Sequence, residues 1–189
     1  MDANTLTMFR KGGLFRKGTV QHYPIRRATW GLSQPLPYSV PVLSFAIEAE
    51  EQVSLFPEEN GWTHAPKWRL DVWTRGLDDR MLLASSQFAI PEWCDEFTGV
   101  IYTMFYYDEH EGTERNNVKV IARTQDFLDL AIEGHISDTN ASMPPTSITV
   151  NARFTKLIPH DGIDARLNRQ KLPAHQPPVG AVFSPSPVG

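Results

Sequence analysis

The densest cluster of ionisable side chains lies in one short stretch, residues 108–114. It contains Asp108, Glu109, His110, Glu111 and Glu114. Carboxylates and histidine can bind a divalent metal ion or transfer protons. A metal site at Asp108, His110 and Glu111, serving a metal-dependent hydrolase, is therefore one hypothesis.

The spacing within this stretch argues against a metal site. A calcium loop requires oxygen ligands at alternating positions and a glycine at the sixth, and the stretch does not match that pattern. Runs of charged residues more commonly form a solvated surface. We expect the stretch to be the acidic tip of a hairpin.

Catalytic and cofactor motifs are not found elsewhere in the sequence. There is no Gly-x-Ser-x-Gly elbow, no phosphate-binding glycine loop and no dinucleotide fingerprint. The single cysteine, Cys94, is followed by Asp95 and Glu96, which disfavour a thiolate. One cysteine also excludes an intramolecular disulfide and a thiolate-rich zinc site. The sequence predicts a non-catalytic protein without a cofactor.

The elements that would position the tip are β-strands. Two β-prone runs, 100–107 and 118–122, flank the acidic stretch, and apolar and polar residues alternate along 43–50, 68–72, 128–136 and 148–155. A period of two indicates strands with one buried face. The pattern predicts a mostly β protein, a single antiparallel β-sandwich of roughly seven strands. The only expected helix is a short one at 91–97.

The two ends of the chain differ from its centre in composition. Residues 1–30 contain six Lys and Arg against one acidic residue, whereas residues 31–158 contain nine against 19. A repeated Phe-Arg-Lys-Gly and several glycines favour an extended arm over a helix. We therefore expect a basic flexible arm at 1–19, a sandwich domain at 20–158 and a proline-rich tail at 159–189.

Large aromatic side chains exceed what one small core must hide. Trp73 falls on the strand face opposite Trp68, and Phe105 and Tyr107 share one face of their strand. Either the segment around Trp30 and its neighbouring prolines folds over one sheet and buries these rings, or some of the rings are exposed. Exposed aromatic residues are typical of protein interfaces. The candidate partner-binding residues are Arg10, Lys11, Arg16, Lys17, Trp73, Phe105, Tyr107, Asp108, Glu109 and Glu111.

These observations favour a protein-binding module, such as an inhibitor, an immunity-type partner or a subunit of a larger assembly. Its partner would be another protein, with a basic surface that suits the acidic domain. An alternative is nucleic-acid contact through the basic arm, although the net charge of −10 over residues 31–158 would repel a polyanion. With no apolar run of membrane-spanning length and no signal peptide, we expect a cytoplasmic protein with no membrane contact.

Overall fold

The computed structural model describes most of the chain and shows it to be mostly β. It describes residues 4–11, 18–33, 42–73, 82–90, 92–94, 100–107, 109–137, 146–157 and 182–184. The strands are β1 (Thr5–Arg10), β2 (Thr19–Ser33), β3 (Val42–Ala49), β4 (Gln52–Val53), β5 (Thr63–His64), β6 (Lys67–Trp73), β7 (Gln87–Ile90), β8 (Thr103–Tyr106), β9 (His110–Arg123), β10 (Phe127–Ser137), β11 (Thr146–Lys156) and β12 (Val182–Ser184). A three-residue 3₁₀ turn, η1 (Pro57–Glu59), lies between β4 and β5. No helix in the described ranges has the length and apolar character needed to cross a bilayer.

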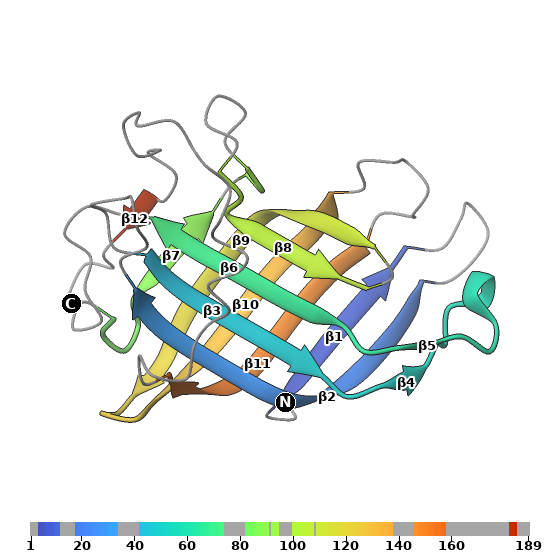
Figure 1. Cartoon of the computed structure of the whole chain (residues 1–189), viewed down its shortest axis with the longest axis horizontal. Helices are drawn as coiled ribbons and strands as arrows, with labels where there is room; N and C mark the ends of the chain where they lie inside the picture. Colours follow the sequence, from blue (N-terminus) through green and yellow to red (C-terminus); the bar gives the residue numbers. More distant parts are fainter. Residues whose placement is uncertain are drawn as a thin grey trace.

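Ten of these strands form one sheet, in the order β10-β11-β1-β2-β3-β6-β8-β9-β7-β12 (Figure 1). Neighbouring strands are antiparallel, apart from a short parallel pairing of β11 with β2. Because β9 also pairs with β10, the sheet returns to the strand at which it began. Strands β4 and β5 form a separate two-stranded sheet.

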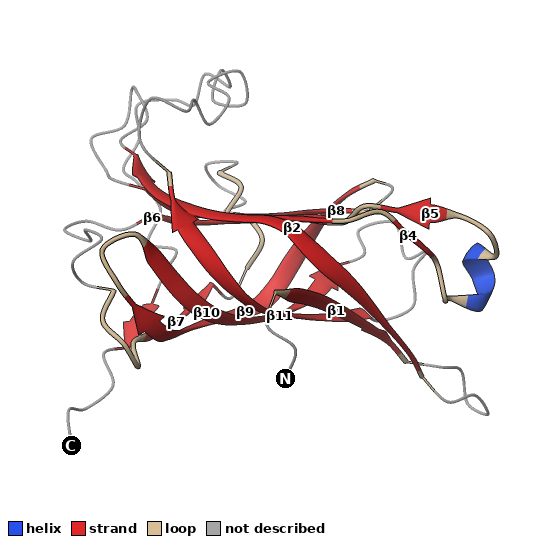
Figure 2. Cartoon of the chain, turned by 90° about the horizontal axis from the view of Figure 1, so that it is seen from below, coloured by secondary structure: helices blue, strands red, loops and turns tan. Residues whose placement is uncertain are grey.

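The predicted sandwich of roughly seven strands is not confirmed in its details. The ten strands of the large sheet form one continuous sheet that folds over into two facing layers, as Figure 2 shows edge on. Two layers produce the same alternation of buried and exposed residues as two separate sheets. The alternation therefore predicted the antiparallel β class but could not reveal that the layers are joined.

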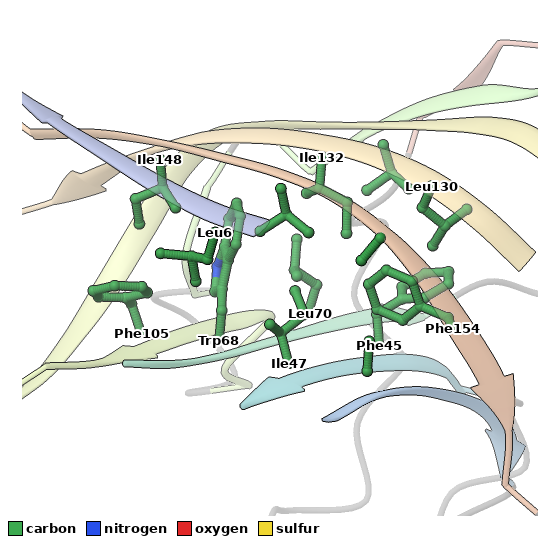
Figure 3. Packing of buried hydrophobic residues seen from close by; sticks show 14 of the residues in the cluster. Leu6, Phe45, Ile47, Trp68, Leu70, Phe105, Leu130, Ile132, Ile148 and Phe154 are labelled. Carbon is green, nitrogen blue, oxygen red and sulfur yellow. The ribbon is translucent and has the colours of Figure 1, made fainter. Parts of the chain in front are cut away.

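The side chains between the two layers fill the interior. Phe45 packs against Phe88 and Phe154, with ring centroids 5.9 and 6.0 Å apart. Trp68 and Leu130 are also fully buried within this core (Figure 3). The four alternating segments predicted from the sequence contribute their apolar faces to it.

The prediction of a flexible arm at residues 1–19 is wrong for residues 5–10. These residues form β1, which pairs with β2 on one side and β11 on the other. Leu6 and Met8 are completely buried. Buried and less buried residues alternate along this segment, as is typical of a half-buried strand. The prediction relied on the basic charge and the glycines of the segment and did not use this alternation.

Two smaller expectations also differ from the structure. Val182–Ser184, within the predicted proline-rich tail, pairs with β7. The helix expected at 91–97 is not present at Glu92–Cys94, because Cys94 instead forms an isolated bridge with Ile101. The other expected helical positions lie outside the described residues.

Candidate functional site

The acidic tip is smaller than the sequence suggested. Tyr106 already pairs with His110, so residues 110–114 belong to strand β9 rather than to a loop. Glu111 is buried, whereas Glu109 and His110 are exposed. Asp108 lies outside the described residues.

Two of the three predicted metal ligands, His110 and Glu111, are not brought together, and the third, Asp108, lies outside the described residues. His110 and Glu111 are consecutive in a strand, so their side chains leave it on opposite faces. Within the described ranges, no group of three or more His, Cys, Asp or Glu side chains could hold a metal ion. The described residues therefore give no support to a metal site at the acidic tip.

Several predicted partner-binding residues are buried and cannot contact a partner in this conformation. Phe105, Tyr107 and Arg10 are almost completely inaccessible. Trp73 is half-buried and packs against the core. Lys11 is exposed, like Glu109, and Arg16 and Lys17 lie outside the described residues. Phe105 and Tyr107 share a buried face of the sheet, and the sequence did not show which face the second layer covers.

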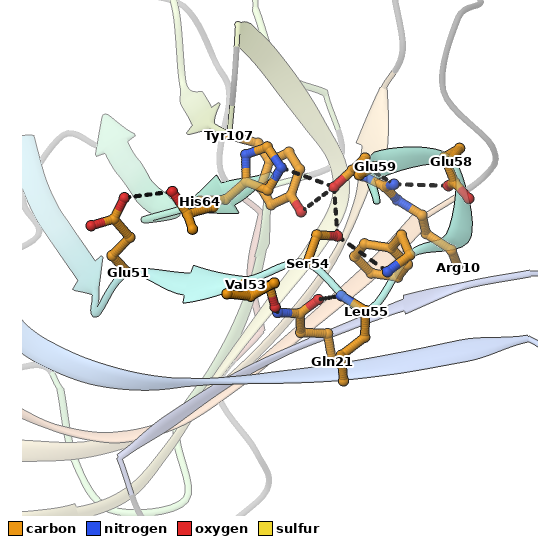
Figure 4. A network of polar contacts seen from close by, with 12 residues as sticks. Arg10, Gln21, Glu51, Val53, Ser54, Leu55, Glu58, Glu59, His64 and Tyr107 are labelled. Atoms are coloured by element: carbon orange, nitrogen blue, oxygen red, sulfur yellow. Dashed lines mark hydrogen bonds and ion pairs between the residues drawn. The ribbon is translucent and has the colours of Figure 1, made fainter. Parts of the chain in front are cut away.

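The structure instead reveals a buried polar cluster beneath the β4–η1–β5 excursion, shown in Figure 4. We call this excursion, residues 51–64, the hairpin segment. It contributes Ser54, Glu59 and His64 to the cluster. The large sheet contributes Arg10 from β1, Tyr23 from β2 and Tyr107, which directly follows β8. The cluster thus joins the hairpin segment to three distant parts of the sheet.

Glu59 is the central acceptor of this cluster. Its Oε2 atom accepts hydrogen bonds from the hydroxyls of Tyr107 at 2.7 Å and Ser54 at 2.8 Å. The Nε2 atom of His64 lies 3.0 Å from the same oxygen. Burial alone would raise the pKa of Glu59, but the hydrogen bonds from Tyr107, Arg10 and Ser54 outweigh it and the pKa is lowered. Glu59 is therefore an ionised carboxylate.

Arg10 provides the compensating charge. Its side chain is only 4% exposed, and its Nη1 atom forms ion pairs with Glu59 and with Glu58, the latter at 2.9 Å. The guanidinium lies 3.9 Å above the ring centroid of Phe56. Arg10 of β1 is therefore held by two glutamates of η1 and by Phe56, the residue before η1.

Tyr107 links the carboxylate to the sheet. Its hydroxyl lies 3.0 Å from that of Tyr23, and its ring stacks on His64 with the centroids 4.0 Å apart. Burial, together with the hydrogen bonds to Tyr23 and Glu59, raises the pKa of Tyr107 far above its ordinary value. The phenol therefore stays protonated at physiological pH.

Proton-transfer chemistry would require these groups to reach a substrate. The side chains of Glu59 and His64 are only 12% and 1% exposed, and the hydrogen bonds of the carboxylate are made to other residues of the protein. Gln21 adds two further bonds beneath the segment, donating to the Val53 carbonyl at 3.0 Å and accepting from the Leu55 amide at 2.7 Å. The arrangement is that of an anchor that fixes the hairpin segment on the sheet.

The hairpin segment has three exposed apolar side chains and is acidic. Val53, Leu55 and Trp62 are 57%, 63% and 60% exposed. Residues 51–64 also contain three glutamates and no lysine or arginine. No period-two pattern marks this segment in the sequence, because only four of its residues lie in regular strands. The available signal was a Pro-Glu-Glu-Asn-Gly turn bracketed by Leu55 and Trp62.

Comparison with protein-family models, with curated proteins and with solved structures finds no match for this chain. Its function is therefore argued from the geometry above.

Proposed function

We propose that this protein is a non-catalytic protein-binding module and that the hairpin segment is its contact surface. The observation that carries the proposal is the exposure of Val53, Leu55 and Trp62 on a segment anchored from behind by a buried ion pair. Tryptophan is among the residues that contribute most to protein interfaces. Single exposed apolar residues are common, but three within ten residues are a candidate binding surface.

The anchor favours binding because it orders the segment in advance. A loop that becomes ordered only on binding loses conformational entropy, and that loss subtracts from affinity. Here Arg10, Gln21 and Tyr107 already hold the backbone and side chains of the segment. The apolar residues are thus presented without a large ordering cost.

The charge of the segment indicates the chemistry of the partner. Two exposed glutamates, Glu50 and Glu51, stand at its start, and Glu58 is half exposed. Because the segment has no lysine or arginine, the best match is a partner whose binding surface has basic residues around an apolar centre. Opposite charges would speed the association of the two proteins at low salt. Such a surface is compatible with an inhibitor, an immunity-type protein or an assembly subunit.

Site-specific photo-crosslinking tests the proposal. A photoreactive phenylalanine analogue replaces Trp62 in the full-length protein expressed in its native host, and a matched variant carries it at Ile121, which is 53% exposed on β9. We expect a discrete adduct with a positively charged protein from position 62 only. The adduct should weaken when Leu55→Ser is added and when salt is raised.

Three results would contradict the proposal. They are no adduct at position 62, adducts of equal yield at both positions, or an adduct that Leu55→Ser does not change. Because both photoreactive positions are exposed and Leu55 is not in the core, these variants should fold like the wild type.

A further inference from the structure

A second feature of the sheet is an opening between β2 and β11. Strand β1 lies between them over Thr5–Arg10. Beyond the start of β1, β2 and β11 pair directly only at Thr29 with Thr155 and at Trp30 with Lys156. The interval contains a hollow of about 400 Å³, within the range of small-molecule sites.

Asn4 fixes the end of this hollow. It has a left-handed backbone with φ of 65°. Its amide donates to the Asn151 carbonyl at 2.7 Å, its carbonyl accepts from the Ile25 amide at 2.9 Å, and its Oδ1 atom accepts from the Arg153 amide at 3.0 Å. One residue therefore ties both strands together where β1 begins.

The lining of the hollow is strongly cationic. It includes Arg26, Arg27, Arg153 and Lys156, and no lining residue is acidic. This concentration occurs in a protein whose residues 31–158 have a net charge of −10. A local positive site on an acidic surface focuses small anions there while the surrounding charge opposes large polyanions.

Two of the four cations are held in position by carboxylates outside the hollow. Arg26 pairs with Glu48 at 2.7 Å. Arg153 forms a bidentate pair with Asp129, at 2.8 and 2.9 Å. Because these pairs are exposed, they are weak and orient the guanidinium groups more than they neutralise them. The ammonium group of Lys156 lies 5.1 Å from the centroid of the Trp30 ring.

Arg27 is the cation best placed to bind a ligand. Its side chain is exposed and forms no ion pair or hydrogen bond with the described part of the chain. A guanidinium presents several donors in a plane that matches two oxygens of a phosphate group. Thr29 and Thr155 add hydroxyl groups to the same lining.

We propose that the hollow between β2 and β11 is a binding site for the phosphate group of a small-molecule ligand. Arg27 makes the principal contact, and Arg26, Arg153 and Lys156 supply the surrounding positive field. Both the volume of the hollow and the acidic charge of the rest of the protein favour a small ligand over a nucleic acid.

Isothermal titration of the full-length protein with inorganic pyrophosphate tests this site, at an ionic strength held constant with sodium chloride. We expect saturable binding of one pyrophosphate per chain. Arg27→Gln should weaken it about tenfold, the usual effect of losing a charge-assisted hydrogen bond. Arg69→Gln is the matched control, because Arg69 lies on β6 and pairs with Asp71 at 2.8 Å.

Amide chemical shifts locate the bound anion. The amide signals of Asn4, Arg27 and Thr155 should shift on addition of pyrophosphate. Their shifts should saturate at the same pyrophosphate concentration as the heat of binding. Heat that vanishes at constant ionic strength, equal weakening by both substitutions, or shifts elsewhere in the protein would overturn it. None of these measurements depends on the hairpin segment, so this inference stands or fails separately from the proposed function.

Discussion

Glu59→Gln is the sharpest test of the anchor, because it removes one charge while keeping nearly the same shape. The side chains of Arg10 and Glu59 are only 4% and 12% exposed. Removing one partner of a buried ion pair generally costs about 3–5 kcal/mol, since the other charge stays buried. Glu58 still pairs with Arg10, so we expect the lower end, about 3 kcal/mol. For a chain of this size, that lowers Tm by roughly 6–12 °C.

Urea unfolding followed by tryptophan fluorescence measures this effect, and Glu58→Gln is the matched control. The side chain of Glu58 is 49% exposed, so its loss should cost less than about 1 kcal/mol. If Glu59→Gln changed the free energy of unfolding by no more than Glu58→Gln, the carboxylate would not be the centre of the anchor.

The pH dependence of the same pair of proteins provides a second readout. Because the pKa of Glu59 is lower in the folded protein than its ordinary value near 4.5, its ionised form stabilises the fold. This stabilisation is complete above the ordinary value and is lost as pH falls through the lower, folded value. The difference between wild type and Glu59→Gln should therefore shrink on acidification below about pH 4.5. A difference that grew there would refute the assignment.

Three further substitutions, with Gly31→Ala as a control for one of them, test the anchor, strand β1 and the contact between Gly112 and Trp93 by chemical denaturation. Tyr107→Phe should cost about 1–3 kcal/mol because it removes a buried hydroxyl with two partners, and an unchanged midpoint would contradict this. Met8→Ala should cost about 2–5 kcal/mol because Met8 is completely buried, whereas a flexible arm would tolerate it. Gly112→Ala should cost about 1–3 kcal/mol, since a Cβ there would lie 2.4 Å from the Trp93 ring. Gly31→Ala, with its nearest contact at 3.6 Å, should cost less than Gly112→Ala, and equal costs would refute the steric argument.

The β class and the buried faces of individual strands were predictable from the sequence. Leu128, Leu130 and Ile132 point inward and Glu133 and His135 outward, as the alternation indicates. This succeeds because the side-chain period of a strand is fixed by backbone geometry. Such local patterns show how residues close in the sequence are oriented, but not which distant residues they contact.

The site was not predictable in the same way, because its members come from distant parts of the chain. Arg10 and Glu59 are 49 residues apart, and Tyr107 is 48 residues beyond Glu59. Charged residues such as Arg10 look exposed in a sequence unless their partner is known. The acidic stretch at 108–114 was predicted as a site only because it contains many ionisable residues close together. The residues of the buried polar cluster are instead spread along the sequence, so their interactions are not evident from local composition.

The position of β1 between β2 and β11 has a consequence for how the protein is made. Thr5 pairs with Asn151, 146 residues later in the chain, so β1 is synthesised long before the strand β11 that pairs with it. Until β11 emerges, one edge of β1 has no partner, and pairings over such sequence distances form slowly. We therefore expect the sheet to close only after β11 has been synthesised.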